Sequence, residues 1–358
     1  MLPELDAERI RLAALGKQAF VAPDFFIDHF VRYPSSYSNL KTEFDRVITQ
    51  GGGNVLGTKQ YIAKGGNAVN TAIALGHLQI KTKLFTVTDT LGYYLLRLFI
   101  GDLPIDISCV RTDGVPSITT ALEVKSSRGK LTNIMVSASG SLLTIDAEHL
   151  SDKILELAKD SDAVCFFNWA QTKKGTDIAE ALFKAAKEEG KGLTFFDPGD
   201  PSYKKQEIPV LAKRLFYRGL IDIVSMNENE FARFSKVLRV GTDKGSQLRG
   251  KKDLLLLSDK LSCRIDYHTT EFSATAYEGQ CDMMACFRIE PVRATGSGDT
   301  WNAGDILGYL SDLQPGNRLL LANATAASYI TNPMPSPPSL TEAIEFASSN
   351  PLKRISIH

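Results

Sequence analysis

A glycine-rich stretch late in the chain holds the residues best suited to chemistry. The run Thr295-Gly296-Ser297-Gly298-Asp299 stands between CFRIEPV (286–292), which resembles a strand, and a helical pattern that continues to residue 313. A chain that turns through glycines into a helix leaves several backbone N–H groups unpaired, and these can bind an anion such as a phosphate. An aspartate in the first turn of that helix can act as a base beside the bound group. We therefore expect Asp299 to do chemistry, although a tight turn without a ligand would leave the same pattern.

A second aspartate, Asp305, follows six residues later in the same helical pattern. That separation places it about 9 Å along the helix axis and about 120° around it, so we expect a solvated or packing residue. Other phosphate-binding patterns are missing from the sequence. No Gly-Lys pair is followed by Ser or Thr, and Trp301 stands where a dinucleotide fingerprint would need glycine.

Together with three further segments, this stretch resembles the ribokinase-like (phosphofructokinase-B type) carbohydrate kinases. In that family a Thr-Gly-Ala-Gly-Asp run supplies the anion hole and the catalytic base, and residues 295–299 match it. The resemblance implies that Asp299 deprotonates the substrate hydroxyl. It also implies that the backbone of Gly296, Ser297 and Gly298 steadies the transferring γ-phosphoryl group of ATP.

The resemblance implies where the phosphate acceptor binds. Residues 65–70, GGNAVN, are similar to the family's Gly-Gly-x-x-x-Asn substrate motif. In that motif Asn70 can bond sugar hydroxyls, and Gly66 lets a ligand lie on the backbone. Asp28 aligns with an early aspartate that binds sugar hydroxyls. A loop glycine pair before an ordinary helix would explain the first match without any ligand.

Three residues are implied for the nucleotide and one for magnesium. Thr295 and Asn227 would contact the nucleotide, and Asn323 in LLLANATAAS lies on a helix that borders the adenine in the family. Asn227 and Glu230 are similar to an Asn-x-x-Glu pattern, whose glutamate helps to place Mg²⁺ through water. Mg²⁺ prefers oxygen ligands and keeps several waters. A helix start rich in Asn and Glu would look the same.

The sequence departs from the family pattern beside the expected phosphate site. Arg293-Ala294 replaces an Asp-Thr pair whose aspartate is a cation ligand in members activated by potassium. Because an arginine there brings its own positive charge, we expect no potassium dependence. Thr270 and Ser273 stand where two glycines near the nucleotide are usual, which leaves the details of that pocket open.

The acceptor region departs from the pattern as well. Phe26 stands where a sugar-contacting asparagine is usual, and Asn168 or Trp169 replaces a mid-chain acid that grips the substrate. These changes predict an acceptor other than plain ribose. The rings of Phe26 and Trp169 could stack on that acceptor, or they could fill core space.

Alternating strand and helix patterns must position these residues. Short apolar segments at 18–23, 81–88, 162–170, 191–199 and 221–230 alternate with helical patterns, which favours a mostly parallel sheet with helices on both faces. Segments at about 38–63 and 115–137, the second with a turn at 127–130, indicate antiparallel hairpins that form a small β lid. With the resemblance, they predict one ribokinase-like α/β domain over residues 1–358. It is a three-layer sandwich in which residues 1–17 form a helical extension.

Composition excludes several other classes of protein. The chain has 358 residues, of which 43% are hydrophobic and 23% charged, as in globular domains. Its 41 basic residues balance 41 acidic ones, which argues against nucleic acid or a membrane as a partner. Five cysteines without a Cys-x-x-Cys pair argue against a disulfide framework or a zinc site. No apolar run approaches the roughly 20 residues of a transmembrane helix, so we expect a cytoplasmic protein. Lid-to-lid homodimers are frequent in the family, and we expect one here.

The combined prediction is an ATP-dependent kinase that uses Mg²⁺ and phosphorylates a hydroxyl of a sugar, sugar acid or polyol. Two alternatives stay open. One is a nucleoside kinase of the same fold that takes adenosine or cytidine, and the other is a ribokinase-like protein that binds a sugar or nucleotide without catalysis. Asp299 and its glycines argue against the second alternative, because a pure binder needs no base. A nicotinamide dehydrogenase would need the fingerprint that the chain lacks.

Overall fold

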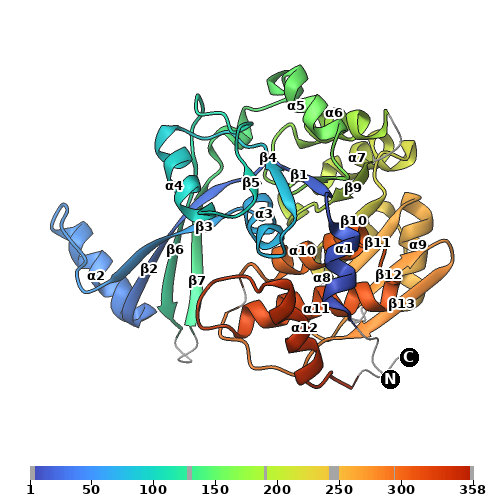
Figure 1. Ribbon diagram of the computed structural model, residues 1–358. Coiled ribbons are helices and arrows are strands. Elements are labelled where there is room, and N and C mark those ends of the chain that lie inside the picture. The colour runs from blue at the N-terminus through green and yellow to red at the C-terminus, as the bar shows by residue number, and fades with distance from the viewer. Residues whose placement is uncertain (1–4, 127–130, 189–191, 242–249, 294, 355–358) are drawn as a thin grey trace.

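A computed structural model gives the fold of the chain (Figure 1). It describes residues 5–126, 131–188, 192–241, 250–293 and 295–354. The turn expected at residues 127–130 lies outside the described residues. None of the described helices has the length and apolar character needed to cross a lipid bilayer.

A nine-stranded sheet forms the centre of the fold. Its order is β13-β12-β11-β10-β9-β8-β1-β4-β5, and all neighbouring pairs from β11 to β5 are parallel, whereas β12 and β13 are antiparallel. Strand–helix alternation predicted this mostly parallel sheet, and the prediction is confirmed. The strands are β1 (Gln18–Ala22), β4 (Lys81–Leu84), β5 (Ile105–Asp106), β8 (Ala163–Phe166), β9 (Leu193–Phe196), β10 (Ile223–Asn227), β11 (Arg264–His268), β12 (Phe272–Tyr277) and β13 (Gln280–Ala285).

Both faces of this sheet are covered by helices, which is why its central strands read as continuous apolar runs. Successive side chains of a strand point to opposite faces. Accordingly Phe195 belongs to one hydrophobic core and Phe196 to the other. The three layers expected from the sequence are therefore present.

The helices divide between the two cores. One face carries α1 (Ala7–Ala14), α3 (Asn67–His77), α4 (Thr90–Ile100), α10 (Ser297–Leu310), α11 (Pro315–Thr331) and α12 (Leu340–Ser349). The other face carries α5 (Asp152–Lys159), α6 (Gly175–Lys187), α7 (Ile208–Arg214), α8 (Glu228–Leu238) and α9 (Lys251–Leu261). Short 3₁₀ turns occur at Gly140–Leu143, Ala147–His149, Pro201–Tyr203, Lys205–Glu207 and Phe216–Arg218.

A second, four-stranded sheet projects from one side of this sandwich (Figure 1). Its order is β3-β2-β6-β7, built from β2 (Phe26–Ser36), β3 (Lys59–Gly65), β6 (Ser117–Lys125) and β7 (Leu131–Ala138). The antiparallel pairing expected within 115–137 is present as β6 and β7.

The expectation of a hairpin within 38–63 is wrong. The first part of that segment is a helix, α2 (Tyr37–Thr49), and β3 pairs instead with β2, which begins well before residue 38. The helix carries an apolar stripe at helical spacing, formed by Tyr37, Leu40, Phe44, Val47 and Ile48, although only Leu40 of these is buried. The strand expected at 286–292 is also missing. Its only pairing is a single bridge between Phe287 and Leu352, because the chain leaves the edge strand β13 and crosses to α10.

Candidate active site

Polar residues gather where five parallel strands end. Asn227 and His268 are the last residues of β10 and β11, and Asp24, Asn168 and Asp197 follow closely after β1, β8 and β9. The carboxyl ends of neighbouring parallel strands share one edge of the sheet, where ligands of open α/β folds bind. The main sheet thus builds a polar edge, and α3, α10 and the small sheet add further groups to it.

Asp24 joins the first strand to helix α3. Its carboxylate is fully buried and accepts hydrogen bonds from the backbone N–H groups of Asn67 and Ala68, both at 2.8 Å, and from Nδ2 of Asn168 at 2.9 Å. Burial raises the pKa of Asp24, and these three donors oppose that rise. Asp24 therefore fixes the start of the helix that carries the expected acceptor motif.

The expected acceptor glycines pack against this region. Gly66 has φ of 93°, and a β-carbon on it would lie 2.8 Å from the carbonyl oxygen of Asp24. A β-carbon on Gly65 would lie 2.3 Å from the carboxylate of Asp28. Gly66 is thus needed for close approach to the main chain, whereas a larger residue at Gly65 would require the Asp28 side chain to move.

Asp28 and Lys64 come from the paired strands β2 and β3 of the small sheet. The Asp28 side chain is buried, and no described residue donates a hydrogen bond to it. Burial raises the pKa of Asp28 to about 6, although the charge of Lys64 opposes the shift. Burial likewise lowers the pKa of Lys64 to about 8, against the charges of Asp299 and Asp28. A carboxylate without a protein donor suits a ligand that brings hydroxyl groups.

Asp299 lies in the first turn of α10, as the sequence predicted. The helix begins after Gly296, whose φ of 81° is left-handed, and among the described residues no side chain caps its first N–H groups. The Asp299 carboxylate accepts a hydrogen bond of 2.9 Å from Nδ2 of Asn70, whose Oδ1 accepts one of 2.8 Å from Nζ of Lys64. Burial raises the pKa of Asp299 well above its usual range, and the Asn70 bond and the Lys64 charge oppose the rise. The structure thus brings a base-like carboxylate, free helical N–H groups and Asn70 together.

For Asp305 we expected either a solvated or a packing residue, and it is not solvated. It is fully buried and forms an ion pair with Arg318, which also pairs with Asp266 at 2.8 Å and lies over the ring of Tyr309. The turn of α10 that holds it packs on α11, and a β-carbon on Gly304 would lie 2.8 Å from the Cα of Ala322. Asp305 is therefore a packing residue inside a buried ionic cluster.

Asn227 and Glu230 form the start of α8. Both Glu230 carboxylate oxygens accept hydrogen bonds from Asn227, one from its backbone N–H and one from its side chain, both at 2.8 Å. Burial raises the pKa of Glu230 well above its usual range, and the charge of Asp197 adds to the rise. Asp197 itself accepts from Asn302 Nδ2 at 2.7 Å, and its pKa is raised to about 6 by burial.

The charge of this pair fits a divalent cation. Within the described part of the chain neither Asp197 nor Glu230 forms an ion pair with a lysine, arginine or histidine. No group of three or more His, Cys, Asp or Glu side chains that could hold a metal directly occurs among the described residues. Two buried carboxylates without a counter-charge suit Mg²⁺ held through water, because this ion keeps several of its waters.

A cavity of about 180 Å³ opens beside the start of α10. Ser297 and Gly298 form part of its wall, and Asn323 lies in it with Oδ1 accepting from Trp301 Nε1 at 2.8 Å. His268 contacts Trp301 on the same wall, and burial lowers the pKa of His268 to about 4. The other lining residues are Thr269, Thr270, Cys286, Phe287, Ile289, Pro291, Ala326, Ala327, Ile330 and Lys353. This mostly apolar cavity lies where the resemblance implies a nucleotide.

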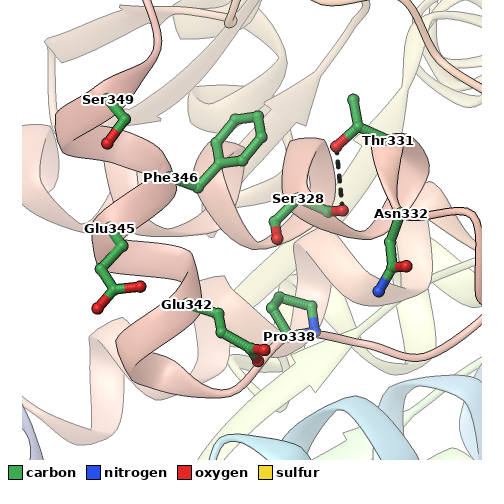
Figure 2. Close-up of a pocket in the computed structure, with 8 residues that line it drawn as sticks. All are labelled: Ser328, Thr331, Asn332, Pro338, Glu342, Glu345, Phe346 and Ser349. Atoms are coloured by element: carbon green, nitrogen blue, oxygen red, sulfur yellow. Dashed lines mark hydrogen bonds between the residues drawn. The ribbon is translucent and has the colours of Figure 1, made fainter.

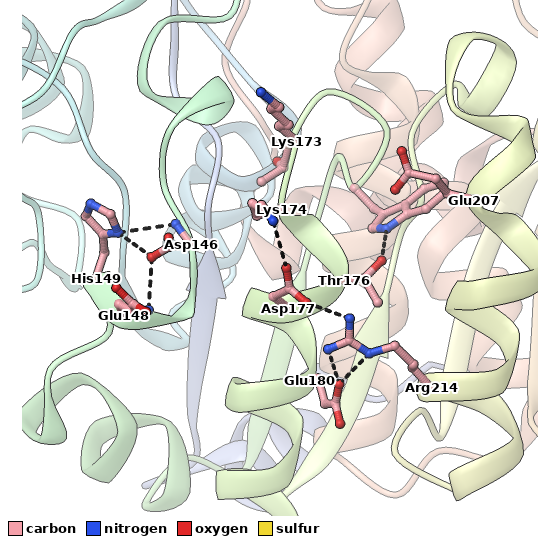
Figure 3. Close-up of polar contacts among 12 residues, drawn as sticks. Asp146, Glu148, His149, Lys173, Lys174, Thr176, Asp177, Glu180, Glu207 and Arg214 are labelled. Carbon is pink, nitrogen blue, oxygen red and sulfur yellow. Dashed lines mark hydrogen bonds and ion pairs between the residues drawn. The ribbon is translucent and has the colours of Figure 1, made fainter.

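The suggestion that Trp169 stacks on a ligand is wrong. Trp169 is fully buried in the main core, Lys204 Nζ lies 4.5 Å from its ring centroid, and its Nε1 donates to Thr176 Oγ1 at 2.9 Å. Figure 3 shows the Thr176 bond beside the ion pairs that Arg214 forms with two carboxylates of α6. Phe26 belongs to the same core, so both aromatic residues fill core space.

A larger hollow of about 390 Å³ lies elsewhere, between α11 and α12 (Figure 2). Glu342, Glu345 and Phe346 line one side of it, and Ser328 and Thr331 line the other. None of the expected site residues lines this hollow, and the Glu342 carboxylate already caps α12 through Ser339. Size alone therefore does not mark the site.

The expected residues fall into three neighbouring groups. Asp299 and Asn70 are in contact; Ser297, Gly298 and Asn323 line the cavity; and Asn227 and Glu230 cap α8. Thr295 is exposed in the turn before α10 and does not line the cavity.

Sequence reasoning missed Asp24, Asp197 and Lys64. Asp197 follows a strongly apolar strand directly, so its position at the end of that strand was a usable signal. Lys64 gave none, because a lysine beside a glycine pair is common in exposed turns.

Comparison with known proteins identifies the family of the chain. Residues 41–342 match the pfkB family carbohydrate kinases. A ketohexokinase from Haloferax volcanii is 27% identical over 264 residues, which cover 69% of this chain and 65% of that protein. The match thus spans slightly less than two thirds of that relative.

Solved structures share the fold at low sequence identity. An Arabidopsis thaliana ribokinase in complex with ribose and ATP superposes with a TM-score of 0.71 at 17% identity, over 93% of this chain and 99% of that one. A 2-dehydro-3-deoxygluconokinase from Thermotoga maritima superposes with a TM-score of 0.73 at 16% identity, over 93% of this chain and 100% of that one. A Sinorhizobium meliloti adenosine kinase superposes with a TM-score of 0.70 at 18% identity, over 92% of this chain and 99% of that one. The fold is therefore ribokinase-like. Since the family match covers most of the sequence, the chain belongs to the pfkB family carbohydrate kinases.

Proposed function

We propose that this protein transfers the γ-phosphoryl group of ATP to a hydroxyl of a sugar, sugar acid or polyol. The observation that carries the proposal is the start of α10. A buried carboxylate, Asp299, stands there beside helical N–H groups that no side chain caps. Asn70 and Asp28 supply polar groups on one side, and the 180 Å³ cavity lies on the other.

Each part of this arrangement has a role in the transfer. Asp299 takes the proton of the acceptor hydroxyl. The hydroxyl oxygen then bonds to the γ-phosphorus of ATP while the bond between that phosphorus and the leaving ADP oxygen breaks. The backbone N–H groups of Ser297 and Gly298 hold the negative charge of the phosphoryl oxygens, and the dipole of α10 favours that charge. Asp28, Gly66 and Asn70 hold and orient the acceptor.

The nucleotide and metal assignments follow the same geometry. We assign the adenine to the cavity wall at Asn323, with Thr295 and Asn227 as further nucleotide contacts. Glu230, together with Asp197, would hold Mg²⁺ through water. When bound, that ion supplies positive charge for the phosphate oxygens.

Sugar-type acceptors are favoured over nucleosides. A nucleoside kinase would gain from an aromatic ring that stacks on the base, but the two aromatic candidates, Phe26 and Trp169, are buried in the core. The buried, donor-free carboxylate of Asp28 suits an acceptor that brings several hydroxyls. The adenosine kinase fold match keeps nucleosides among the acceptors to be tested.

A phosphorylation screen tests the proposal. The protein with ATP and Mg²⁺ should convert at least one sugar, sugar acid or polyol, and Asp299→Asn should remove that conversion. Turnover of adenosine or cytidine alone would move the assignment to a nucleoside kinase. Binding of a sugar or of ATP with no turnover of any acceptor would instead support a non-catalytic role.

We further propose that the small sheet acts as a lid and joins two copies in a homodimer. One face of it carries the exposed aliphatic side chains Ile62, Ile118, Ile134 and Val136. Strand register places all four on this one face. An exposed apolar face of this kind is commonly covered by a partner.

A further inference from the structure

Lys64 lies inside the acceptor region although no motif assigned it. It is partly buried at the end of β3, and its Nζ donates a hydrogen bond of 2.8 Å to Oδ1 of Asn70. Asn70 in turn donates through Nδ2 to Oδ2 of Asp299 at 2.9 Å. A chain of two hydrogen bonds therefore runs from the lysine of the small sheet to the carboxylate of α10.

The direction of this chain follows from the chemistry of its members. A lysine ammonium has only donors, so it accepts nothing and selects the carbonyl end of the Asn70 amide. The NH₂ end of that amide is then left to face Asp299, where it needs an acceptor. If the amide turned over, its carbonyl oxygen would face the Asp299 carboxylate, an arrangement that is stable only when Asp299 is protonated.

The charges around Asp299 make this orientation important. Burial disfavours the ionised form of Asp299, and Asp197 and Asp24 add negative charge near it, so the pKa of Asp299 lies well above its usual range. Lys64 is the one positive group that opposes these effects within the described structure. The groups that act on Lys64 itself are Asp299 from α10 and Asp28 from β2, while its own charge disfavours protonation of His77 at the end of α3.

We propose that Lys64 is a positioning residue for the reaction: it fixes the Asn70 amide in the orientation that donates to Asp299, and its charge keeps that carboxylate ionised. This inference rests on the proposed function, because it gives Asp299 the role of base. The ionised state of Asp299 then depends on the position of the small sheet, since Lys64 belongs to β3.

Three lysine variants test the inference through pH profiles of kcat and kcat/KM. Lys64→Met removes the charge and the hydrogen bond, and Lys64→Arg keeps both. Lys59→Met is the matched control, because Lys59 is an exposed residue of the same strand. We expect Lys64→Met to lower kcat about tenfold at pH 7 and to move the acidic limb of the profile up by about one pH unit. Lys64→Arg should retain most of the activity with the limb near its original position, and Lys59→Met should match the wild type.

A second measurement needs no acceptor. Carboxyl ¹³C titration of aspartate-labelled protein follows Asp299 directly, with the resonance assigned from its loss in Asp299→Asn. The titration midpoint of Asp299 should rise by about one pH unit in Lys64→Met and should not change in Lys59→Met. Circular dichroism and thermal melting of each variant show whether the fold is intact.

The outcomes separate this inference from the proposed function. An unshifted limb and an unshifted Asp299 titration in a folded Lys64→Met protein would overturn the positioning role alone. A change confined to the KM for the acceptor would also overturn it and make Lys64 a substrate contact. Full activity of Asp299→Asn would overturn both, because Asp299 would then not be the base.

Discussion

The side-chain amide of Asn70 donates a hydrogen bond of 2.9 Å to the carboxylate of Asp299, which lies 229 residues further along the chain. This contact joins the first turn of α3 to the first turn of α10, two helices that pack on the same face of the main sheet. It makes the expected acceptor motif and the expected phosphate motif parts of one site.

The two aspartates of α10 should respond to substitution in opposite ways. Asp299→Asn should lower kcat by about 10²–10⁴, the usual contribution of a general base, and leave the melting temperature nearly unchanged. Asp305→Asn should instead destabilise the fold by roughly 3 kcal/mol, because it breaks a buried pair with Arg318. Steady-state kinetics and urea unfolding of both variants check this. Equal kinetic losses in two stable variants would mean that the base is misassigned.

Monovalent cations should not activate the enzyme. Arg293 donates to the backbone carbonyls of Met334 at 2.7 Å and Pro333 at 2.8 Å, and its guanidinium lies 5.3 Å from the ring centroid of Tyr329. The guanidinium of Arg293 thus already binds these carbonyl oxygens, which are the kind of group that would otherwise bind a monovalent cation. Rates measured in potassium, sodium and a large organic cation at equal ionic strength should agree, whereas clear activation by potassium would contradict the prediction.

Filling the 180 Å³ cavity should weaken the binding of ATP and leave the binding of the phosphoryl acceptor unchanged. Ala326 lines the cavity, so Ala326→Phe should raise the KM for ATP by about tenfold or more while the acceptor KM stays constant. Ser328→Phe is the control, since Ser328 lies on the same helix but lines the outer hollow of Figure 2. An unchanged KM for ATP in Ala326→Phe would place the nucleotide elsewhere.

The small sheet should hold two copies together. Light scattering should give twice the 39.2 kDa of the chain, and Val136→Asp should give the monomer because it places a charge in the aliphatic face. Met135→Asp, on the opposite face of the same strand, should remain dimeric. A wild-type monomer at micromolar concentration would remove the basis for this interface.

The sequence was a good guide to the fold where the pattern was local. Strands such as β1 and β9 are short apolar runs between turn residues, and the structure has both. Helix α2 was not predicted although its apolar residues Leu40, Phe44 and Ile48 recur at helical spacing. The polar residues between them and the glycines that follow drew attention away from this period.

The site was predictable only in part, for a similar reason. Asp299 could be found because glycines and a helix surround it in the sequence itself. Lys64 matters through a partner six residues away and a carboxylate on α10, so only the folded chain reveals it. Trp169 misled because an aromatic residue after a strand looks the same whether it faces a ligand or the core.

The uncapped start of α10 links stability to ligand occupancy. Helices α3, α4, α8 and α12 receive a hydrogen bond from a side chain at their N-termini, whereas α10, like α5, α6, α7, α9 and α11, receives none from the described residues. A glycine at the N-cap, as in α10, costs a helix only a few tenths of a kcal/mol relative to a capping side chain. A bound phosphate would accept hydrogen bonds from the first N–H groups of α10, which have no side-chain partner among the described residues. The first amides of α10 should therefore exchange hydrogen with solvent faster than those of α8 in the free protein, and slow down when a nucleotide binds.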